Sequence, residues 1–329
     1  ILAGPWLGQA LADLGAEVIK VEAPEGDDTR QWGPPFVERP GPDGGTERSA
    51  AYFHAANRGK RSVTADFRTE AGRERVRTLA AGADILIENF KVGGLAKYGL
   101  DYESLSALNP RLVYCSITGF GQDGPYAARA GYDFLIQGMS GLMSVTGEPD
   151  QPPQKVGVAV TDIVTGLYGA VGVLAAVEQR HRTGRGQHLD LSLLDCAVAL
   201  MANQAMHCLA SGVAPRRLGN AHPNIVPYQA VPAADGWIIL AVGNDGQFAR
   251  LCEVLDLAAL AADPAYATNP ARVAHRDALM PLLEAATRRW PAAELLAALE
   301  AATVPAGPIN DLAGVFADPQ VVARGLQIA

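Results

Sequence analysis

The first half of the chain alternates short strand-like segments with helix-like ones. The strand-like segments, rich in apolar and β-branched side chains, are residues 17–22, 62–67, 83–89 and 112–118. A helical segment begins near Asp101 and ends before Asn109, which is followed by Pro110. Strands joined through helices pair in parallel, because the helix carries the chain back to the starting edge of the sheet. The pattern predicts an α/β fold with a parallel sheet.

A helix is predicted at the very start, over residues 6–14, with Pro5 in its first turn. In a doubly wound sheet a helix follows a strand, so we expect the first strand to lie upstream of Ile1. Further along, the sequence predicts a long apolar helix over 163–180, a strand over 188–193 and a helix over 195–210.

The pattern of predicted strands and helices changes after Pro215. A buried strand is predicted over 237–242 and a helix over 246–255, followed by Ala- and Leu-rich helices up to residue 302. We therefore expect a large Rossmann-like domain over 1–215 and a smaller α+β domain over 216–312.

Composition excludes several classes of protein. With 27 Lys and Arg against 35 Asp and Glu, the net charge is -8, which argues against a nucleic-acid partner. The four cysteines have no C-x-x-C spacing, which indicates reduced thiols in a cytoplasmic protein and no zinc site. The longest apolar stretch, 163–177, is about five residues short of a membrane span, so no membrane partner is predicted. Because the chain begins with Ile1 instead of Met, an organellar signal stays open.

Asp162 is the acid of greatest interest, because it stands at the start of the predicted long helix. One interpretation is a helix N-cap, for which Asp is among the best residues. The other is a nucleophilic carboxylate, kept ionised because a helix N-terminus lowers its pKa. The two interpretations are compatible.

Asn89 and Phe90 follow a predicted strand, at the edge where α/β sheets bind ligands. An aromatic ring next to Gly93 and Gly94 suits stacking on a purine, although the segment could equally be a plain turn into a helix. Basic side chains nearby in the sequence could hold phosphates, or could form an ordinary solvated surface. They are Arg58, Lys60, Arg61, Arg68 and Lys97.

Several well-known motifs are missing. The chain has no G-x-G-x-x-G, no P-loop and no G-x-S-x-G, which argues against dinucleotide enzymes, P-loop proteins and α/β-hydrolases. The six histidines lack metal-ligand spacing, so no metal is predicted.

An ordered set of short segments nevertheless resembles the class III CoA-transferases, the superfamily of formyl-CoA transferase, carnitine CoA-transferase and α-methylacyl-CoA racemase. The likeness is collinear and covers nearly the whole chain. Its segments are residues 3–5 (AGP), 14–22 (LGAEVIKVE), 57–62 (NRGKRS), 88–90 (ENF), 131–133 (GYD), 140–143 (SGLM), 146–147 (TG), 162–166 (DIVTG) and 183–187 (TGRGQ).

The resemblance implies an enzyme that moves CoA from an acyl-CoA to a small carboxylic acid, with Asp162 as the covalent nucleophile. Acyl-CoA is then a substrate, and no cofactor is permanently bound. The resemblance assigns the CoA site to Arg68, Asn89, Phe90, Lys97, Gly131 and Tyr132. It also implies an interlocked homodimer in which residues 313–329 return toward the large domain.

Some positions depart from the family pattern. Leu2 and Ala23 stand where formyl-CoA transferase has an active-site glutamine and a CoA-binding arginine, and residues 219–223 replace its run of glycines. Formyl-CoA and oxalate are therefore not expected as substrates. A dicarboxylate such as succinate or glutarate is the alternative, with Arg129, Arg216 and Arg217 as possible partners for its distal carboxylate.

Three other functions fit the sequence less well. The racemase branch uses a histidine where this chain has Tyr132, and a tyrosine hydroxyl, which ordinarily titrates at about pH 10, is a poor base at neutral pH. Retention of Asp162 argues against a non-catalytic CoA-binding homologue, and the missing glycine motif argues against an NAD enzyme. The transferase is the predicted function.

Overall fold

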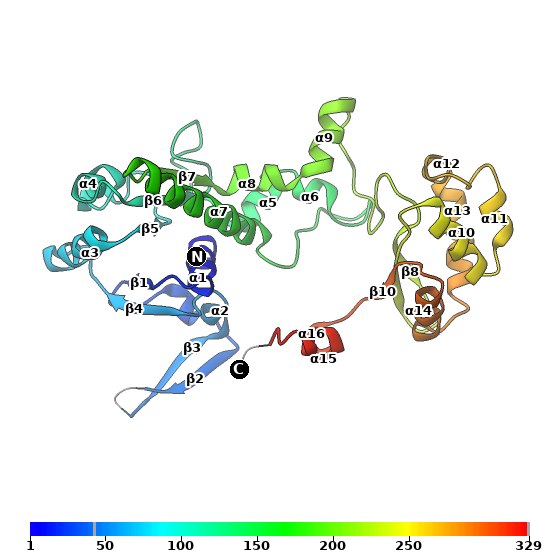
Figure 1. Ribbon diagram of the computed structural model, residues 1–329, viewed down its shortest axis with the longest axis horizontal. Coiled ribbons are helices and arrows are strands. Elements are labelled where there is room, and N and C mark those ends of the chain that lie inside the picture. Colours follow the sequence, from blue (N-terminus) through cyan, green and yellow to red (C-terminus); the bar gives the residue numbers. More distant parts are fainter. Residues whose placement is uncertain (42–43, 328–329) are drawn as a thin grey trace. The chain divides into compact units, whose positions relative to one another are not determined.

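A computed structural model describes residues 1–41 and 44–327 (Figure 1). These residues form two compact units. The first comprises Ile1–Thr146 and Pro153–Arg216, and the second comprises Gly147–Pro152 and the chain from Arg217 onward. The fold is mixed α/β, which confirms the predicted class. Residues 313–327 are grouped with the second unit, and their return toward the large domain stays a prediction.

Parallel strands form the framework of the first unit. One sheet has the order β5 (Ile85–Glu88), β6 (Val113–Thr118), β7 (His188–Ser192), and β1 (Val18–Glu22) pairs in parallel with β4 (Lys60–Thr64). All five were predicted. Strand β4 was expected over 62–67, and it begins two residues earlier and ends three residues earlier than expected. The sequence did not predict the antiparallel pair β2 (Phe36–Pro40) and β3 (Thr46–Ala50), whose mostly exposed, charged residues carry little apolar alternation.

Helices cover both faces of the three-stranded sheet. They include α1 (Ala3–Asp13), α3 (Glu70–Gly82), α4 (Tyr102–Leu108) and α7 (Val160–Thr183). On one face Leu7 and Val173 pack against Val113, Cys115 and Ile117, and on the other face α3 and α4 pack against Tyr114. The close approach of α1 and α7 requires glycine. A Cβ at Gly166 would lie 2.9 Å from the carbonyl oxygen of Ala3, and one at Gly169 would lie 2.9 Å from Leu7.

Two predicted helices differ from those observed. Helix α7 begins at Val160 instead of Ile163, with Ala159 as its N-cap. The helix expected over 195–210 is two helices, α8 (Leu193–Leu200) and α9 (Ala202–Ser211), bent by 75° at Ala202, whose φ is +39°.

By length and composition alone, α7 could cross a membrane, and so could the bent pair of α8 and α9. The apolar stretch 163–177 is part of this longer helix, which has 24 residues and also contains charged ones. One or two such helices are weak evidence of a membrane span, since the core helix of a soluble protein passes the same test. Helix α7 packs against α1, α8 and the sheet in the first unit.

The second unit has an antiparallel sheet with the order β10 (Ala306–Pro308), β9 (Trp237–Ala241), β8 (Tyr228–Pro232). Ile238 and Leu240 of β9 are buried against the helices that follow, as the apolar run predicted. Those helices are α10 (Asp245–Val254), α11 (Ala258–Ala262), α12 (Asn269–Ala274), α13 (Arg276–Thr287) and α14 (Ala292–Ala301). Two short helices, α15 (Leu312–Ala317) and α16 (Pro319–Ala323), follow β10.

Candidate active site

Asp162 lies in the first turn of α7, but it does not cap the helix. The capping carboxylate comes from Asp133, the first residue of α5 (Asp133–Met139). Its Oδ1 accepts hydrogen bonds from the Thr161 N–H at 2.8 Å, the Thr161 hydroxyl at 2.6 Å and the Asp162 N–H at 3.4 Å. Its Oδ2 accepts a bond from Gln137 at 2.7 Å. Asp133 thus fixes the backbone beneath Asp162 and occupies the positive end of α7.

The environment of Asp162 explains its expected reactivity. Burial raises the pKa of its carboxyl to about 6, and the negative charge of Asp133 acts in the same direction. The expectation that the helix N-terminus would lower this pKa is therefore wrong, because Asp133 already takes the N–H groups. At neutral pH a carboxyl with this pKa is mostly ionised, yet no Lys or Arg of the described chain neutralises it. An ionised carboxylate without an ion-pair partner is suited to nucleophilic attack.

Two aromatic residues that the sequence did not single out lie side by side, and one of them, Tyr52, is close enough to be affected by the charge of this carboxylate. Tyr52 is on α2 (Ala51–His54), and its pKa is raised by burial and then by the negative charges of Asp162 and Asp133. The ring of Trp32 lies 5.3 Å from that of Tyr52. The sequence carries no signal for either position, because both come from segments more than 100 residues before α7.

Tyr132 and Gly131 precede Asp133 and so lie next to the same helix end. Tyr132 is the N-cap residue of α5, and its side chain is 61% exposed, which leaves it open to a ligand. Gly131 has a packing reason to be glycine, because a Cβ there would lie 2.3 Å from the Cα of Gly119. Its role in binding CoA stays a prediction.

A second cluster gathers at the end of β5, where Phe90 is 47% exposed. The ring of Phe67 lies 6.0 Å from that of Phe90 and 6.1 Å from that of Tyr98, and Lys97 Nζ lies 4.8 Å from the centre of the Tyr98 ring. An aromatic surface with a cation beside it suits a purine and its phosphates. Phe67 and Tyr98 were not predicted, because neither is marked out in the sequence.

The other predicted CoA residues lie around this aromatic cluster. Arg68 follows Phe67, and its guanidinium is paired with Asp66 at 2.8 Å and with Glu25 at 3.3 Å, so its charge is largely balanced. Asn89 lies beside Gly4 of α1, since a Cβ at Gly4 would be 3.9 Å from the Asn89 side chain. Helix α1 also touches the first turns of α7 through Ala3 and Gly166, so it links the aromatic cluster to the helix of Asp162.

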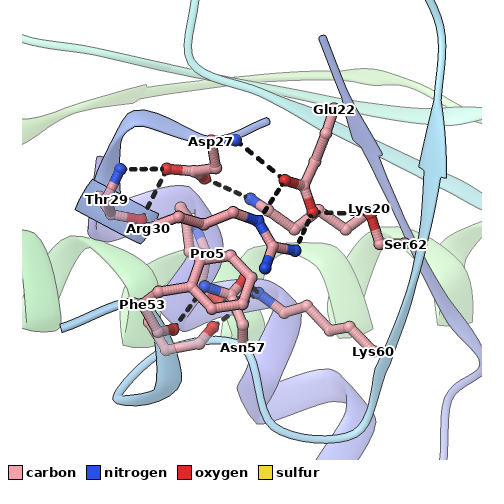
Figure 2. A network of polar contacts seen from close by, with 11 residues as sticks. Pro5, Lys20, Glu22, Asp27, Thr29, Arg30, Phe53, Asn57, Lys60 and Ser62 are labelled. Carbon is pink, nitrogen blue, oxygen red and sulfur yellow. Dashed lines mark hydrogen bonds and ion pairs between the residues drawn. The ribbon is translucent and has the colours of Figure 1, made fainter. Parts of the chain in front are cut away.

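The basic residues around Lys60 already have protein partners, and whether they hold phosphates stays a prediction. Arg58 pairs with Asp13 at 2.5 Å, and Arg61 pairs with Glu17 at 2.9 Å. Lys60 points inward and donates to the carbonyl oxygens of Pro5 and Ala56 and to the Asn57 side chain, at 2.7, 2.7 and 2.9 Å (Figure 2). Burial, and then the charge of Lys20, lower the pKa of Lys60 to about 7.

Beside Lys60 lies an ion pair between the buried Glu22 and the partly exposed Arg30 (Figure 2). Two guanidinium nitrogens of Arg30 lie 2.8 Å from the two Glu22 oxygens, and the Ser62 hydroxyl and the Asp27 N–H also donate to Glu22. Burial alone would raise the pKa of Glu22, but these donors outweigh it and lower the pKa to about 2. The network ties β1 and β4 to the segment that leads to Trp32.

Of the three arginines considered for a distal carboxylate, Arg217 is already engaged. Its guanidinium donates to the carbonyl oxygens of Glu148, Pro149 and Gln151 at 3.0, 3.1 and 2.8 Å. Arg129 lies over the ring of Tyr126 at 3.8 Å, and neither it nor Arg216 has an acidic partner in the described part of the chain. Among residues 1–41 and 44–327, no group of three or more His, Cys, Asp or Glu side chains is placed to hold a metal.

The model of CoA-transferase family III matches residues 1–329. The chain belongs to this family. It is 60% identical to a succinate–glutarate CoA-transferase of Agrobacterium fabrum, over 100% of this chain and 82% of that one. It is 43% identical to a human succinyl-CoA:glutarate CoA-transferase, over 99% of this chain and 73% of that one. The crystal structure of a CAIB/BAIF family protein from Brucella suis matches with a TM-score of 0.89 and 64% identity, over 100% of this chain and 85% of that one.

Membership of this family makes the protein an enzyme, a class III acyl-CoA:carboxylate CoA-transferase. The predicted family is therefore confirmed. The NAD-enzyme interpretation is set aside by the match over the whole chain, and the relatives just described carry transferase names rather than racemase names.

Proposed function

We propose that this enzyme moves CoA from succinyl-CoA to a dicarboxylic acid such as glutarate, with Asp162 as the covalent nucleophile. The observation that carries this proposal is the Asp162 carboxylate itself, half-buried and without a cation partner on a turn that Asp133 holds in place. The substrate pair is supported by the names of relatives at 60% and 43% identity.

In the first half of the reaction, an Asp162 oxygen attacks the thioester carbon of the acyl-CoA and the C–S bond breaks. The products are an aspartyl-acyl anhydride and CoA thiolate. The thiolate then attacks the Asp162 carbonyl carbon, which releases the donor acid as its carboxylate and leaves an aspartyl-CoA thioester. Covalent catalysis of this kind divides one difficult exchange into easier steps.

In the second half, the acceptor carboxylate attacks the aspartyl-CoA thioester and expels CoA thiolate again. The thiolate attacks the acceptor's acyl carbon, which forms the new acyl-CoA and regenerates the Asp162 carboxylate. No proton is gained or lost overall and no water enters. Exclusion of water by the partly buried site protects the anhydride and the thioester from hydrolysis.

The reaction is tested by mixing succinyl-CoA with glutarate in heavy water and following the CoA esters by mass spectrometry. We expect glutaryl-CoA without deuterium at the α-carbon, because the transfer involves only carboxyl carbons. Exchange of α-deuterium into 2-methylacyl-CoA without any CoA transfer would instead favour a racemase. That outcome is not expected, since Tyr132 replaces the basic histidine.

The intermediates provide a direct test of the role of Asp162. Treatment with succinyl-CoA followed by borohydride should reduce the aspartyl-CoA thioester and change the mass of the peptide that contains Asp162. Absence of label in a protein that still turns over would contradict the mechanism.

We also infer a homodimer built on the Rossmann-like large domain. Four side chains of α7 that face away from the sheet, Leu167, Tyr168, Val171 and Leu174, are 47–69% exposed. Met206 and Leu209 of α9 are 61% and 78% exposed. Apolar surface on this scale is typical of a covered interface. Light scattering should give twice the monomer mass, and an active monomer at low micromolar concentration would refute the dimer.

A cytoplasmic location also stays a prediction.

A further inference from the structure

Three of the predicted CoA residues lie on one loop. The segment from Asn89 to Asp101 joins β5 to α4 and carries Asn89, Phe90 and Lys97. A cavity of about 270 Å³ lies beside it, lined by residues of the loop together with Glu88, Ser116 and His188. Leu95 and Leu100 of this loop are buried in the hydrophobic core, and contacts at its two ends hold the residues that lie beside the cavity.

The first end is held through Glu88, the last residue of β5. Its carboxylate accepts a hydrogen bond from the Phe90 N–H at 2.7 Å. Ser116 of β6 is paired with Glu88 in the sheet, and its hydroxyl favours the charged form of the Glu88 carboxylate against the effect of burial, which raises the pKa. The Ser116 Oγ lies 2.8 Å from His188 Nε2 on β7. A line of polar contacts thus crosses three strands and ends on the backbone of Phe90.

The same histidine reaches the second end of the loop. The ring of His188 stacks on Tyr102, the first residue of α4, with centroids 4.8 Å apart and planes at 18°. It also lies edge-on to Tyr114, whose hydroxyl donates to the carbonyl oxygen of Leu100 at 2.9 Å. Ser116 and Tyr114 are each only 2% exposed, so these anchors are shielded from competing water.

We propose that Glu88, Ser116 and His188 are positioning residues that hold loop 89–101 in the shape that binds CoA. The inference rests on the proposed function, because it takes this loop as the CoA site. It goes further by giving a role to one buried and two partly buried polar side chains that lie on the α4 side of the sheet, opposite to α1 and α7. A polar network that only stabilised the sheet would not need to end on the Phe90 N–H.

The test compares Ser116→Ala and Glu88→Ala with wild type, using free CoA as the binding probe in calorimetry and succinyl-CoA with glutarate as the assay. Loss of one anchoring hydrogen bond should raise the Kd for CoA and the KM for succinyl-CoA about 3- to 10-fold. The kcat and the KM for glutarate should change less than about twofold, since Asp162 is untouched. Glu88→Gln keeps an acceptor for the Phe90 N–H and should recover most of the loss.

Thr287→Val is the matched control for general destabilisation. Thr287 is fully buried in the second unit, and its hydroxyl donates to the Glu284 carbonyl oxygen at 3.2 Å. Its loss should lower stability without changing the Kd for CoA. If Ser116→Ala does not fold, Tyr114→Phe tests the other end of the loop, because it removes the bond to Leu100 while the ring stays.

Phe90→Ala separates the two proposals. If it weakens CoA binding while folded Ser116→Ala and Tyr114→Phe bind CoA as wild type does, the positioning inference is overturned and the proposed CoA site stands. If Phe90→Ala itself binds CoA normally, the loop is not the CoA site, and the positioning inference fails with it. Weaker binding in all three variants, with an unchanged KM for glutarate, supports both.

Discussion

Burial raises the pKa of both Glu22 and Asp162, yet the final pKa of Glu22 lies below its ordinary value and that of Asp162 lies above it. Glu22 is 6% exposed, yet its pKa is held at about 2, because Arg30, Ser62 and the Asp27 N–H all donate to it. Asp162 is half-buried with no such donors, and its pKa rises to about 6. The comparison teaches that burial alone does not decide the state of an acid. What decides it is whether the fold also supplies donors.

The same contrast separates structural from chemical roles. The donors around Glu22 use up its lone pairs and lock β1, β4 and the Asp28–Gln31 turn together (Figure 2). At the start of α7 the available donors go to Asp133 instead, and Asp162 keeps an unshared oxygen. A carboxylate that is ionised and poorly stabilised is the better nucleophile, so the fold leaves without donors the acid that we propose as the nucleophile.

The largest effect should come from Asp162→Asn. We expect turnover to fall by about 10⁴-fold or more, which is the scale for removal of a covalent nucleophile. The free energy of unfolding at pH 8 should stay the same or rise. The raised folded pKa means that stability is lost as pH rises from about 4 through 6, so removing the charge removes that penalty. Steady-state kinetics and urea unfolding measure the two effects, and normal turnover in the variant would refute the assignment.

In contrast to Asp162→Asn, Glu22→Gln should lower the free energy of unfolding. Leaving Arg30 without its buried partner should cost about 2–4 kcal/mol at pH 7. Because the folded pKa of Glu22 lies below its ordinary value, its contribution is present above about pH 4.5 and is lost as pH falls toward 2. Unfolding in urea at pH 7 and pH 4 measures both features.

Glu17→Gln is the matched control for Glu22. Glu17 pairs with Arg61, but their side chains are 65% and 79% exposed, so the change should be under about 0.5 kcal/mol. Equal losses of unfolding free energy in Glu17→Gln and Glu22→Gln would show that the Glu22–Arg30 pair stabilises the fold no more than an exposed ion pair does.

Asp133→Asn should have an intermediate effect, on the pH dependence of catalysis. In wild type kcat/KM should fall as pH drops through about 6, because Asp162 must be ionised to attack. The substituted amide still offers an oxygen to the Thr161 N–H but lacks the negative charge, so the midpoint should move down, by up to about one pH unit. Asp13→Asn, which removes an exposed carboxylate paired with Arg58, should leave the profile in place. An upward shift in Asp133→Asn would contradict the proposed electrostatics.

The smallest effect is expected at Lys60. Its folded pKa of about 7 lies below that of an unfolded lysine, so the unfolded chain binds more protons above pH 7. Stability should therefore rise with pH between about 7 and 8.5 in wild type, and this slope should flatten in Lys60→Met. Lys91→Met, at an exposed position, should keep the slope. Identical slopes in all three proteins would mean that Lys60 is solvated.

Local patterns predicted much of the fold and part of the site. Strands β1, β5, β6, β7 and β9 follow apolar runs, and Asn89 and Phe90 were found because the end of a parallel strand is a general binding position. The β2–β3 pair was missed, because its residues are mostly charged and exposed. Phe67, Tyr98, Trp32 and Tyr52 were missed for another reason. Each is an ordinary aromatic residue until folding brings Phe67 beside Phe90 and Tyr98, and Tyr52 beside Trp32 and near the charge of Asp162.

The sequence by itself determined the α/β class and the family and singled out Asp162 as the candidate nucleophile, because hydrophobic periodicity and short motifs are properties of neighbouring residues. Only the tertiary structure decided the state of each charged group. Asp133 caps α7 from 28 residues away, Arg30 neutralises Glu22, and Lys60 points inward and donates to the carbonyl oxygen of Pro5. Solvation and Coulomb interactions depend on what surrounds a group in space, and that is fixed only when distant segments pack together.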